Sequence, residues 1–383
     1  MSLYDLIIDK KNNDQALASS YFFELSMNAR RKRYLYSVLL ELSPICNFKC
    51  PFCYVRKTPD EMQREGTEIL RYQGWRQLLD QLCEYGVINI GLTGGECMLH
   101  PDFIDIYNYA ISKGFLVSMI TNLSALNDDI INAFVTHKPK IINVTLYGGS
   151  EDTYQKICGN KAYFKRVLNN IERLSVEKIP FSLQMTVSKE NYKDLAEVFS
   201  ISKKYNVPFH FNVSFFRMGQ CTKEIQEENL VDEKTIKNAI KQLDDYYGTQ
   251  HIRNTTMIPK PEKNTIGVNC AAGRSNAFIS YRGFMQPCVS FDAVSISTFD
   301  HSIDQCWKYI VSECDKIPMI SECNGCIHWG RCQHCFAMHY ADTKTFDEPS
   351  PLLCFKRLHP EEAKRIETYF AEHGKLPPVD DKF

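Results

Sequence analysis

The sequence predicts an α/β protein, made of a partial (β/α)6 TIM-like barrel followed by a small Cys-rich α+β domain. Two observations carry this prediction. Short apolar runs alternate with helical stripes up to residue 216, and cysteines then crowd a region that has few long periodic segments. Because the alternation repeats six times rather than eight, we expect an incomplete barrel and not a closed one.

The barrel strands are expected at apolar runs that are typical of buried parallel strands. The stripes between them place apolar side chains at i, i+3, i+4 and i+7, as at Trp75, Leu78, Leu79 and Leu82, which is the core face of a helix. The runs are YSVLLEL (36–42), VINIGL (87–92), FLVSMI (115–120), IINVTLY (141–147), FSLQMTV (181–187) and FHFNVSFF (209–216).

Residues that could carry chemistry follow these strands rather than precede them. The segment from Cys46 to Cys53 follows the first run, Gly94 to Glu96 the second and Asn122 the third, while Tyr147 ends the fourth. In parallel α/β folds, ligands bind at the carboxyl ends of the strands. The sequence therefore predicts one site at that end of the barrel.

Charge and composition exclude several classes of protein. The 383 residues carry 45 Lys and Arg against 46 Asp and Glu, so no broad basic field favours nucleic acid or an anionic membrane. We find neither a signal peptide nor an apolar run near the ~18 residues that a membrane helix needs. A cytoplasmic protein is expected, in which thiols stay reduced and the 16 cysteines serve more often as metal ligands than in disulfides.

Composition shifts along the chain predict the domain boundaries. After the barrel comes a polar stretch with Pro259 and Pro261, which is typical of a connector, and metal ligation is expected to replace much of the core of the Cys-rich block. The expected parts are an N-terminal extension (1–34), the barrel (35–216), a connector (217–265), the Cys-rich domain (266–358) and a C-terminal helix and tail (359–383).

Cys46, Cys50 and Cys53 form a CxxxCxxC triplet with no fourth cysteine nearby. Three thiolates can hold three corners of a 4Fe-4S cluster and leave the fourth iron open to an exchangeable ligand. The alternatives are a structural zinc site or free buried thiols. Zinc would need a fourth Cys or His at close spacing, and the nearest histidine, His100, is remote in sequence.

The segment CNFKCPFCY resembles the cluster loop of radical S-adenosylmethionine (SAM) enzymes, and LTGGECMLHPDF resembles their glycine-glycine-glutamate segment. The resemblance implies that the open iron binds the amino and carboxylate groups of SAM and that Glu96 receives the methionyl ammonium. Gly94 and Gly95 would allow close backbone approach to that ligand.

Two further segments are similar to the same family. VTLYGGSEDTY matches its fourth-strand segment, which implies that Thr145 faces the SAM carboxylate, and MITNL matches its third-strand segment, which implies that Asn122 lies near the ribose. Thr and Asn at strand ends are also common as simple caps and turn formers.

The Cys-rich block, called the second block below, contains Cys270, Gly283, Cys288, the segment CNGCIHWGRCQHC (323–335) and Cys354. This pattern resembles the SPASM domain, the auxiliary-cluster extension of radical SAM enzymes. The short gap inside CNGCIHWGRCQHC does not suit a zinc ribbon, whose pairs lie about 15 to 20 residues apart. The resemblance implies two auxiliary iron-sulfur clusters of the 4Fe-4S type. One would be held by Cys323, Cys326, Cys332 and Cys354, and the other by Cys270, Cys288 and Cys335 with an unassigned fourth ligand, for which Cys221, Cys306 and Cys314 are spare thiols.

Together the resemblances imply an enzyme that cleaves SAM reductively to a 5'-deoxyadenosyl radical and abstracts hydrogen from a peptide. LYGGSEDTYQKICGN is closest to the peptide-modifying members, so maturation of a ribosomally made peptide by cross-linking or epimerisation is expected. Alternatives are modification of a small molecule or of a protein side chain, and a non-enzymatic iron-sulfur or zinc scaffold. Sulfatase-maturase-like activity is disfavoured because Val289 replaces the Asp of that group.

The expected partners follow from this chemistry. They are a peptide or small-protein substrate and an external one-electron donor such as flavodoxin or ferredoxin. The stretch 1–34 is shorter than the ~40 residues that a stable leader-binding module needs, so a leader peptide is expected to be read by another surface of this chain or by a separate leader-binding protein. Cys97, Tyr147 and Asp292 are candidates for hydrogen or proton transfer, although each also suits a structural role.

Overall fold

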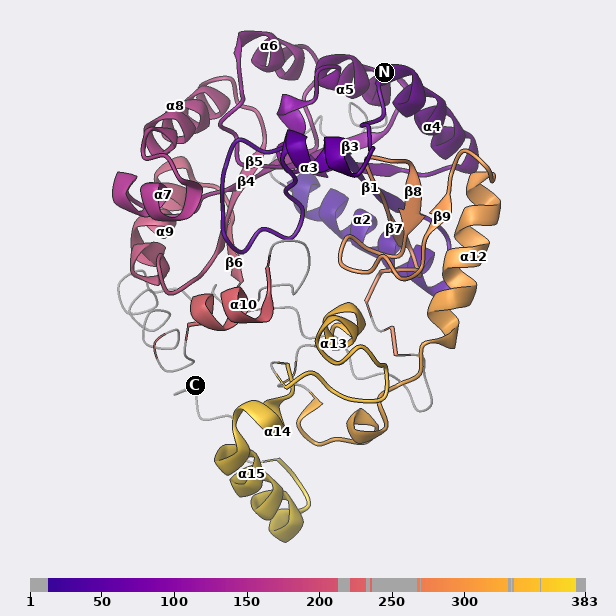
Figure 1. The fold of residues 1–383 in the computed structure, drawn as a ribbon, viewed down its shortest axis with the longest axis vertical. Coiled ribbons are helices and arrows are strands. Elements are labelled where there is room, and N and C mark those ends of the chain that lie inside the picture. Colours follow the sequence, from indigo (N-terminus) through magenta and orange to yellow (C-terminus); the bar gives the residue numbers. More distant parts are fainter. Residues whose placement is uncertain are drawn as a thin grey trace. The chain divides into compact units, whose positions relative to one another are not determined.

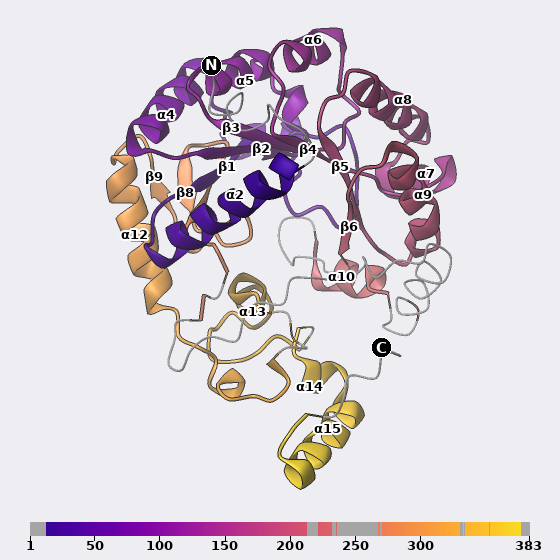
Figure 2. The ribbon, with the colours of Figure 1, turned by 180° about the vertical axis from the view of Figure 1, so that it is seen from behind.

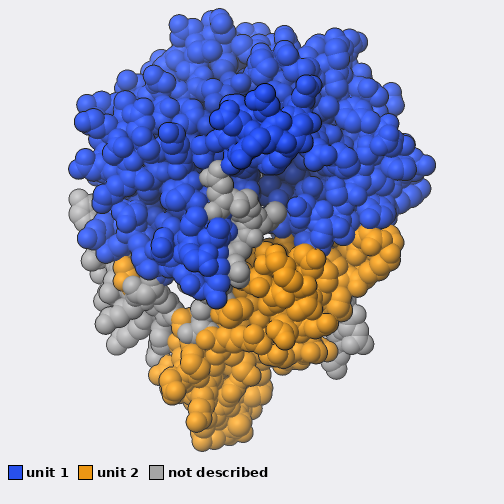
Figure 3. All heavy atoms as spheres, viewed as in Figure 1, with its two compact units in different colours: residues 1–231, 271–311 blue, residues 232–270, 312–383 orange. Residues whose placement is uncertain are grey.

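The computed structural model describes residues 13–212, 221–231, 235, 267–268, 270–329, 332, 334–351 and 353–376. The chain divides into two compact units, residues 1–231 with 271–311 and residues 232–270 with 312–383 (Figure 3). In the part of the chain that is described, no helix combines the length and apolarity needed to cross a membrane.

The first unit is built on a nine-stranded sheet in the order β6-β5-β4-β3-β2-β1-β7-β8-β9 (Figure 1). Its first six strands are all parallel and lie side by side in chain order, which confirms the partial (β/α)6 barrel. They are β1 (Ser37–Ser43), β2 (Asn89–Gly94), β3 (Leu116–Thr121), β4 (Ile141–Thr145), β5 (Phe181–Thr186) and β6 (Phe209–Asn212). Residues 213–216 of the sixth predicted run lie outside the described residues.

Helices cover the outer face of this curved sheet (Figures 1 and 2). In α4 the predicted stripe of Trp75, Leu78, Leu79 and Leu82 is fully buried, so burial of that face holds the helix on the sheet. The helices of the barrel are α4 (Tyr72–Tyr85), α5 (Phe103–Ser112), α6 (Asp128–Thr136), α7 (Glu151–Cys158), α8 (Ala162–Val176) and α9 (Leu195–Tyr205); α3 (Pro59–Arg64) and α10 (Lys223–Asn229) lie in connections.

The helix α2 (Asn13–Arg31) packs at the end of the barrel where the strands begin. The ring of its Phe22 lies 5.1 Å from Nζ of Lys140, directly before β4, and this ammonium donates to Oδ1 of Asn89 at the start of β2. The carboxyl ends of the strands are therefore at the end of the barrel away from these contacts.

Three short strands extend the barrel sheet beyond β1. They are β7 (Asn276–Ile279), which is parallel to β1, and the antiparallel β8 (Phe284–Gln286) and β9 (Ile296–Ser297). The apolar pattern did not predict them, because strands of two to four residues carry too little periodicity. The predicted domain boundaries stay predictions; of the connector, α10 is described and most of the rest lies outside the described residues.

One apolar cluster of the second unit joins its last two helices. Phe355, Ala363 and Ile366 are buried together, and Ile327 and Cys332 pack against them. Its helices are α13 (Phe336–Thr343), α14 (Phe355–Leu358) and α15 (Pro360–His373), while α12 (Ile303–Lys316) begins in the first unit and ends in the second.

Candidate active site

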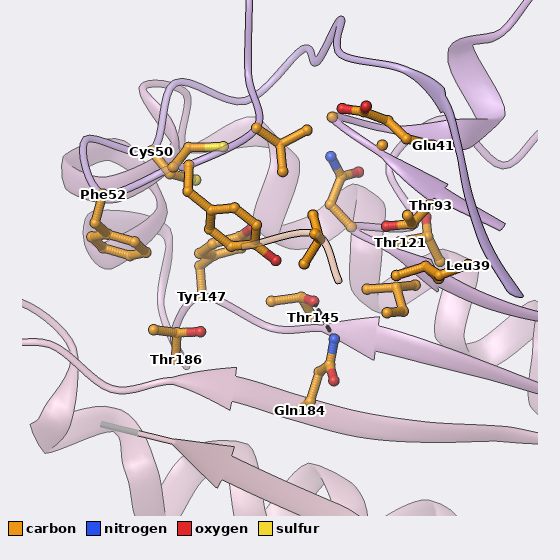
Figure 4. A pocket seen from close by; sticks show the side chains of 18 of the residues that line it. Leu39, Glu41, Cys50, Phe52, Thr93, Thr121, Thr145, Tyr147, Gln184 and Thr186 are labelled. Carbon is orange, nitrogen blue, oxygen red and sulfur yellow. Dashed lines mark hydrogen bonds between the residues drawn. The ribbon is translucent and has the colours of Figure 1, made fainter. Parts of the chain in front are cut away.

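A cavity of about 290 Å³ lies at the carboxyl ends of the barrel strands (Figure 4). Each of the strands β2 to β6 contributes to its lining, through Gly94, Thr121, Thr145, Thr186 and Asn212. The cavity is therefore at the end of the barrel that the sequence predicted for the site.

The loop that follows β1 carries the three triplet thiols and brings two of them to this cavity. Cys50 and Cys53 line it, and the backbone N–H groups of Phe48 and Arg56 donate to Sγ of Cys46 and of Cys53 at 3.4 and 3.3 Å. Burial, with the nearby Cys50 and Cys53, raises the pKa of Cys46 to about 12, and burial also raises the pKa of Cys53. Burial therefore favours the protonated thiols, and a positive centre beside them would favour the thiolates.

A 4Fe-4S cluster fits this loop by the chemistry and burial of its donors. Among the residues described, no three His, Cys, Asp or Glu side chains gather tightly enough to hold a single metal ion. The fit to a wider cluster rests on three partly or fully buried sulfurs that lie near one another, of which Cys46 and Cys53 receive backbone N–H bonds, the usual setting of iron-sulfur ligands.

Cys158 also lies at the cluster loop, although it belongs to neither of the two cysteine-rich segments of the sequence. It is the last residue of α7 and is 1% exposed, its thiol contacts Cys50, and its carbonyl accepts from the Lys49 N–H at 3.1 Å. Burial and this contact hold the pKa of Cys158 far above its usual value. Because more than a hundred residues separate it from the triplet, no local spacing could have revealed it.

Two glycines let the loop after β2 lie directly on the loop after β1. Gly94 has φ +147°, and a Cβ there would come within 2.2 Å of the Ser43 carbonyl oxygen. A Cβ on Gly95 would come within 2.5 Å of the Pro44 carbonyl oxygen, and the Gly95 N–H donates to the Ser43 carbonyl at 2.8 Å. Both glycines line the cavity, and the predicted approach of a ligand to their backbone stays a prediction.

Glu96 is fully buried, and protein donors occupy its carboxylate. Oε1 accepts from Oγ1 of Thr121 at 2.7 Å and from the Met98 N–H at 3.1 Å, while Oε2 accepts from the Asn122 N–H at 2.8 Å. Burial raises the pKa of Glu96 and these bonds lower it. The carboxylate thus joins the ends of β2 and β3, and its predicted contact with the methionyl ammonium stays a prediction.

Cys97 is fully buried beside Glu96. Its thiol lies 3.8 Å both from Oε1 of Glu96 and from the Ile120 carbonyl oxygen, and burial together with the Glu96 charge holds its pKa well above the usual value. The thiol is therefore a protonated group inside the protein wall, and hydrogen donation by Cys97 stays a prediction.

Thr145 and Gln184 line the cavity from β4 and β5. The Gln184 amide donates to Oγ1 of Thr145 at 2.9 Å (Figure 4). Because this bond fills an acceptor position of the hydroxyl, the Thr145 proton is available for a ligand oxygen. The geometry is compatible with the predicted role of Thr145 at the SAM carboxylate.

Thr145→Val is expected to weaken SAM binding about tenfold, since a hydrogen bond to a charged group is worth about 1.5 to 3 kcal/mol. Isothermal titration of the anaerobic cluster-loaded protein with SAM measures the change. Thr136→Val, at the exposed end of α6, is the matched control. Equal SAM affinity in the Thr145 variant and the wild type would contradict the role of this hydroxyl.

A second cavity of about 390 Å³ shares lining residues with the first. The shared residues are Glu41, Tyr54, Val55, Phe278 and Val289, so the two cavities are contiguous. Lys57, Arg282 and Asp292 add charged side chains to the second cavity.

Two of the predicted transfer candidates therefore lie in these cavities. Asp292 lines the second cavity, and Tyr147 lines the first, where burial holds its pKa well above the usual value and keeps the phenol neutral. Val289 is apolar at the position where an Asp was the expected mark of a sulfatase maturase. The transfer roles of Tyr147 and Asp292 stay predictions.

Glu41 is a cavity residue that the sequence did not single out. It lies within β1 and is 7% exposed, and burial raises its pKa to about 7. The Tyr281 N–H, which donates to the carboxylate at 3.3 Å, and the charge of Lys57 lower this pKa by a smaller amount. Figure 4 shows Glu41 among the side chains around the cavity. A single Glu in an apolar run was the only available signal.

Glu41→Gln is expected to stabilise the protein at pH 8 but not at pH 5. Between pH 4.5 and about 7 the folded chain binds more protons than the unfolded chain, so the free energy of unfolding falls as the pH rises through this window. Glutamine removes that loss, which amounts to about 3 kcal/mol at about 1.36 kcal/mol for each pKa unit. Thermal unfolding at both pH values measures it, with the exposed Glu84→Gln as control. A pH-independent difference would contradict the prediction.

In the second unit, the structure brings Cys323, Cys326, Cys332 and Cys354 together. Burial and the other three thiols raise the pKa of Cys323 to about 12, and burial with Cys354 and Cys326 raises that of Cys332 to about 11. The Phe355 N–H donates to Sγ of Cys332 at 3.2 Å. This grouping agrees with the ligand set that the SPASM resemblance implies, and iron binding there stays a prediction.

Two of the remaining predicted ligands approach each other in the second unit. Burial and the nearby Cys270 raise the pKa of Cys335 to about 11. Cys288 belongs to the first unit, where it lies near Tyr54 and, with burial and Cys53, raises the pKa of that phenol to about 12. A shared cluster of Cys270, Cys288 and Cys335 stays a prediction.

Known proteins resemble this chain along most of its length. The profile of the Radical SAM superfamily matches residues 40–200. The Bacillus subtilis antilisterial bacteriocin subtilosin biosynthesis protein AlbA is 25% identical over 75% of this chain and 66% of its own length, just under two thirds. The AdoMet-dependent heme synthase of Methanosarcina barkeri is 23% identical over 82% of this chain and 95% of its own length.

Among solved structures, Streptococcus suis SuiB bound to S-adenosylmethionine has the same fold. The TM-score is 0.65 at 14% identity, over 89% of this chain and 82% of SuiB, and another SuiB structure with TM-score 0.65 is bound to precursor peptide SuiA. Enzymes of the radical SAM family use SAM and a 4Fe-4S cluster. The chain therefore carries a radical SAM domain over residues 40–200.

Proposed function

We propose that this enzyme matures a ribosomally made peptide, by forming a cross-link or by epimerising a residue. The observation that carries the proposal is the pair of contiguous cavities at the cluster loop. The first has room for part of a cofactor-sized ligand beside Cys50, and the second continues from it with charged groups at its wall. A site of this form suits a SAM molecule and a polar substrate chain next to it.

In this proposal Cys46, Cys50 and Cys53 hold the 4Fe-4S cluster. When bound, the cluster and SAM supply the one-electron chemistry that yields a 5'-deoxyadenosyl radical for hydrogen abstraction. The backbone of Gly94 and Gly95 and the Thr145 hydroxyl bind and orient SAM. Tyr147, a neutral buried phenol, excludes water from the wall of the cavity.

The peptide substrate is supported by what the relatives act on. AlbA is named for the biosynthesis of a bacteriocin, and a SuiB structure holds a precursor peptide. Lys57, Arg282 and Asp292 in the second cavity offer both signs of charge, which fits polar groups of an extended peptide better than a purely apolar ligand.

The other expected components belong to this proposal. Two auxiliary iron-sulfur clusters would be held by the second-block cysteines, Cys323, Cys326, Cys332 and Cys354 for one and Cys270, Cys288 and Cys335 for the other. A flavodoxin or ferredoxin would supply the electron, and a separate protein would present the leader of the peptide.

A second candidate function is the modification of a small molecule of the tetrapyrrole class. The observation that favours it is the match to an AdoMet-dependent heme synthase over 95% of the length of that relative. Both candidates use the same SAM site and differ only in the substrate that enters the second cavity.

One experiment separates the two candidates. The reconstituted enzyme is incubated anaerobically with SAM and dithionite, in D₂O, and with either an iron-coproporphyrin or the peptides encoded by short reading frames beside the gene. Loss of two hydrogen atoms from a peptide, or gain of one deuterium at a Cα, supports the proposal. Conversion of the porphyrin alone supports the second candidate, and absence of 5'-deoxyadenosine in every sample contradicts both.

A further inference from the structure

The side chain of Asn122 faces the cluster loop, although the sequence predicted only proximity to the ribose of SAM. Nδ2 of Asn122 donates to Sγ of Cys46 at 3.5 Å and to Oδ1 of Asn47 at 3.3 Å. Asn122 is 4% exposed and also lines the first cavity. A buried side-chain amide thus contacts one of the three thiols expected to hold iron.

The orientation of this amide is fixed by its other bonds. Oδ1 of Asn122 accepts from the Ser124 N–H at 2.9 Å and from the Ser124 hydroxyl at 2.6 Å, so the oxygen points toward Ser124. Only the nitrogen can then face Cys46, because exchanging the two atoms would place an amide N–H₂ against the Ser124 N–H.

The backbone around the amide is equally constrained. The Asn122 N–H donates to the buried carboxylate of Glu96 at 2.8 Å, and Nδ2 of Asn47 donates to the Ser124 hydroxyl at 2.7 Å. A closed ring of hydrogen bonds therefore joins the cluster loop to the end of β3. The donor is held in place before any ligand binds, so it costs no reorganisation.

We propose that Asn122 is a positioning residue that raises the reduction potential of the cluster through its N–H bond to Cys46. The inference rests on the proposed function in one respect, namely that Cys46 ligates the 4Fe-4S cluster. Reduction adds one negative charge, which spreads partly onto the thiolate sulfurs. An N–H dipole aimed at a sulfur stabilises the reduced state more than the oxidised state, and burial strengthens the effect.

The side-chain bond can be separated from the backbone bonds by substitution. The Phe48 N–H also donates to Cys46, and the Arg56 N–H to Cys53, but these donors belong to the main chain. Asn122→Ala removes the side-chain donor without adding charge. Asn122→Asp removes the bonds of Nδ2 to Cys46 and to Asn47 and keeps an oxygen for the two bonds from Ser124. Asn143→Ala is the matched control, because Nδ2 of Asn143 bonds to the Met119 carbonyl within the sheet.

The test is a potentiometric EPR titration of the reconstituted enzyme, following the reduced cluster signal that SAM alters. Asn122→Ala is expected to lower the ratio of reduced to oxidised cluster about tenfold at a fixed potential, a shift of about 59 mV for one electron. Asn122→Asp should shift it further in the same direction because it adds a negative charge. Asn143→Ala should leave the potential unchanged.

Three results would overturn the inference or its basis, and they are distinguishable. An unchanged potential in both Asn122 variants with normal iron content overturns the inference alone. Loss of the cluster from both folded variants also overturns it, because it makes Asn122 an assembly residue instead. A wild-type protein with no SAM-sensitive cluster signal contradicts the proposed function itself.

Discussion

Replacing Cys46, Cys50 and Cys53 together with alanine is expected to reduce SAM cleavage to the level of an enzyme-free control. These thiols are the three cysteines of the loop after β1, and Cys50 and Cys53 line the cavity, so without them that loop cannot hold a cluster there. Anaerobic incubation with dithionite and SAM, followed by chromatography of 5'-deoxyadenosine, measures the loss. Far-ultraviolet circular dichroism establishes that the barrel is still folded.

Cys83→Ala is the matched control for this variant. Cys83 is a half-buried thiol of α4 whose Sγ lies 3.7 Å from the Lys113 carbonyl oxygen, on the outer helical layer of the barrel. It should keep the wild-type rate of SAM cleavage. Persistent 5'-deoxyadenosine formation by the folded triple variant would show that the reducing cluster is held elsewhere.

Replacing Cys323 and Cys326 with alanine is expected to separate SAM cleavage from product formation. The cluster assigned to the second unit loses two of its four proposed ligands, whereas the cavity and the triplet belong to the first unit and are unchanged. Some uncoupled 5'-deoxyadenosine should remain, while modified substrate falls below detection. Quantifying both products in one reaction gives the ratio that checks this.

Cys306→Ala provides the comparison for the second-unit variant. Cys306 is fully buried in α12, and its thiol lies 3.5 Å from the Ser297 carbonyl oxygen. This thiol therefore contacts the backbone and does not belong to the group of Cys323, Cys326, Cys332 and Cys354. The control should keep the wild-type ratio of product to 5'-deoxyadenosine. Full product yield from the Cys323 and Cys326 variant would remove any catalytic need for an auxiliary cluster.

The part of the fold that the sequence predicted is the part with local periodicity. The stripe of Trp75, Leu78, Leu79 and Leu82 and the six apolar runs report burial within one element, and the structure confirms these elements. The position of the site could also be predicted from local pattern. The candidate site residues follow the strands in the sequence, and parallel strands bring their carboxyl ends to one edge of the sheet.

What the sequence missed depends on contacts between distant segments. Cys158 meets Cys50, Gln184 orients Thr145, and Asn122 meets Cys46, and in each case the two residues lie far apart in the chain. The carboxylate of Glu96 accepts a hydrogen bond from the Thr121 hydroxyl, which the motif GGE alone does not indicate. Such roles follow from the register of neighbouring strands, which periodicity does not specify.

The EPR spectrum of the reduced, anaerobically reconstituted protein, recorded with and without SAM, tests the central claim most directly. An iron that the chain leaves without a thiolate must change its ligands when SAM arrives, so we expect a 4Fe-4S signal whose shape SAM alters. A protein that contains zinc in place of iron, or a cluster signal that is identical with and without SAM, would contradict the account.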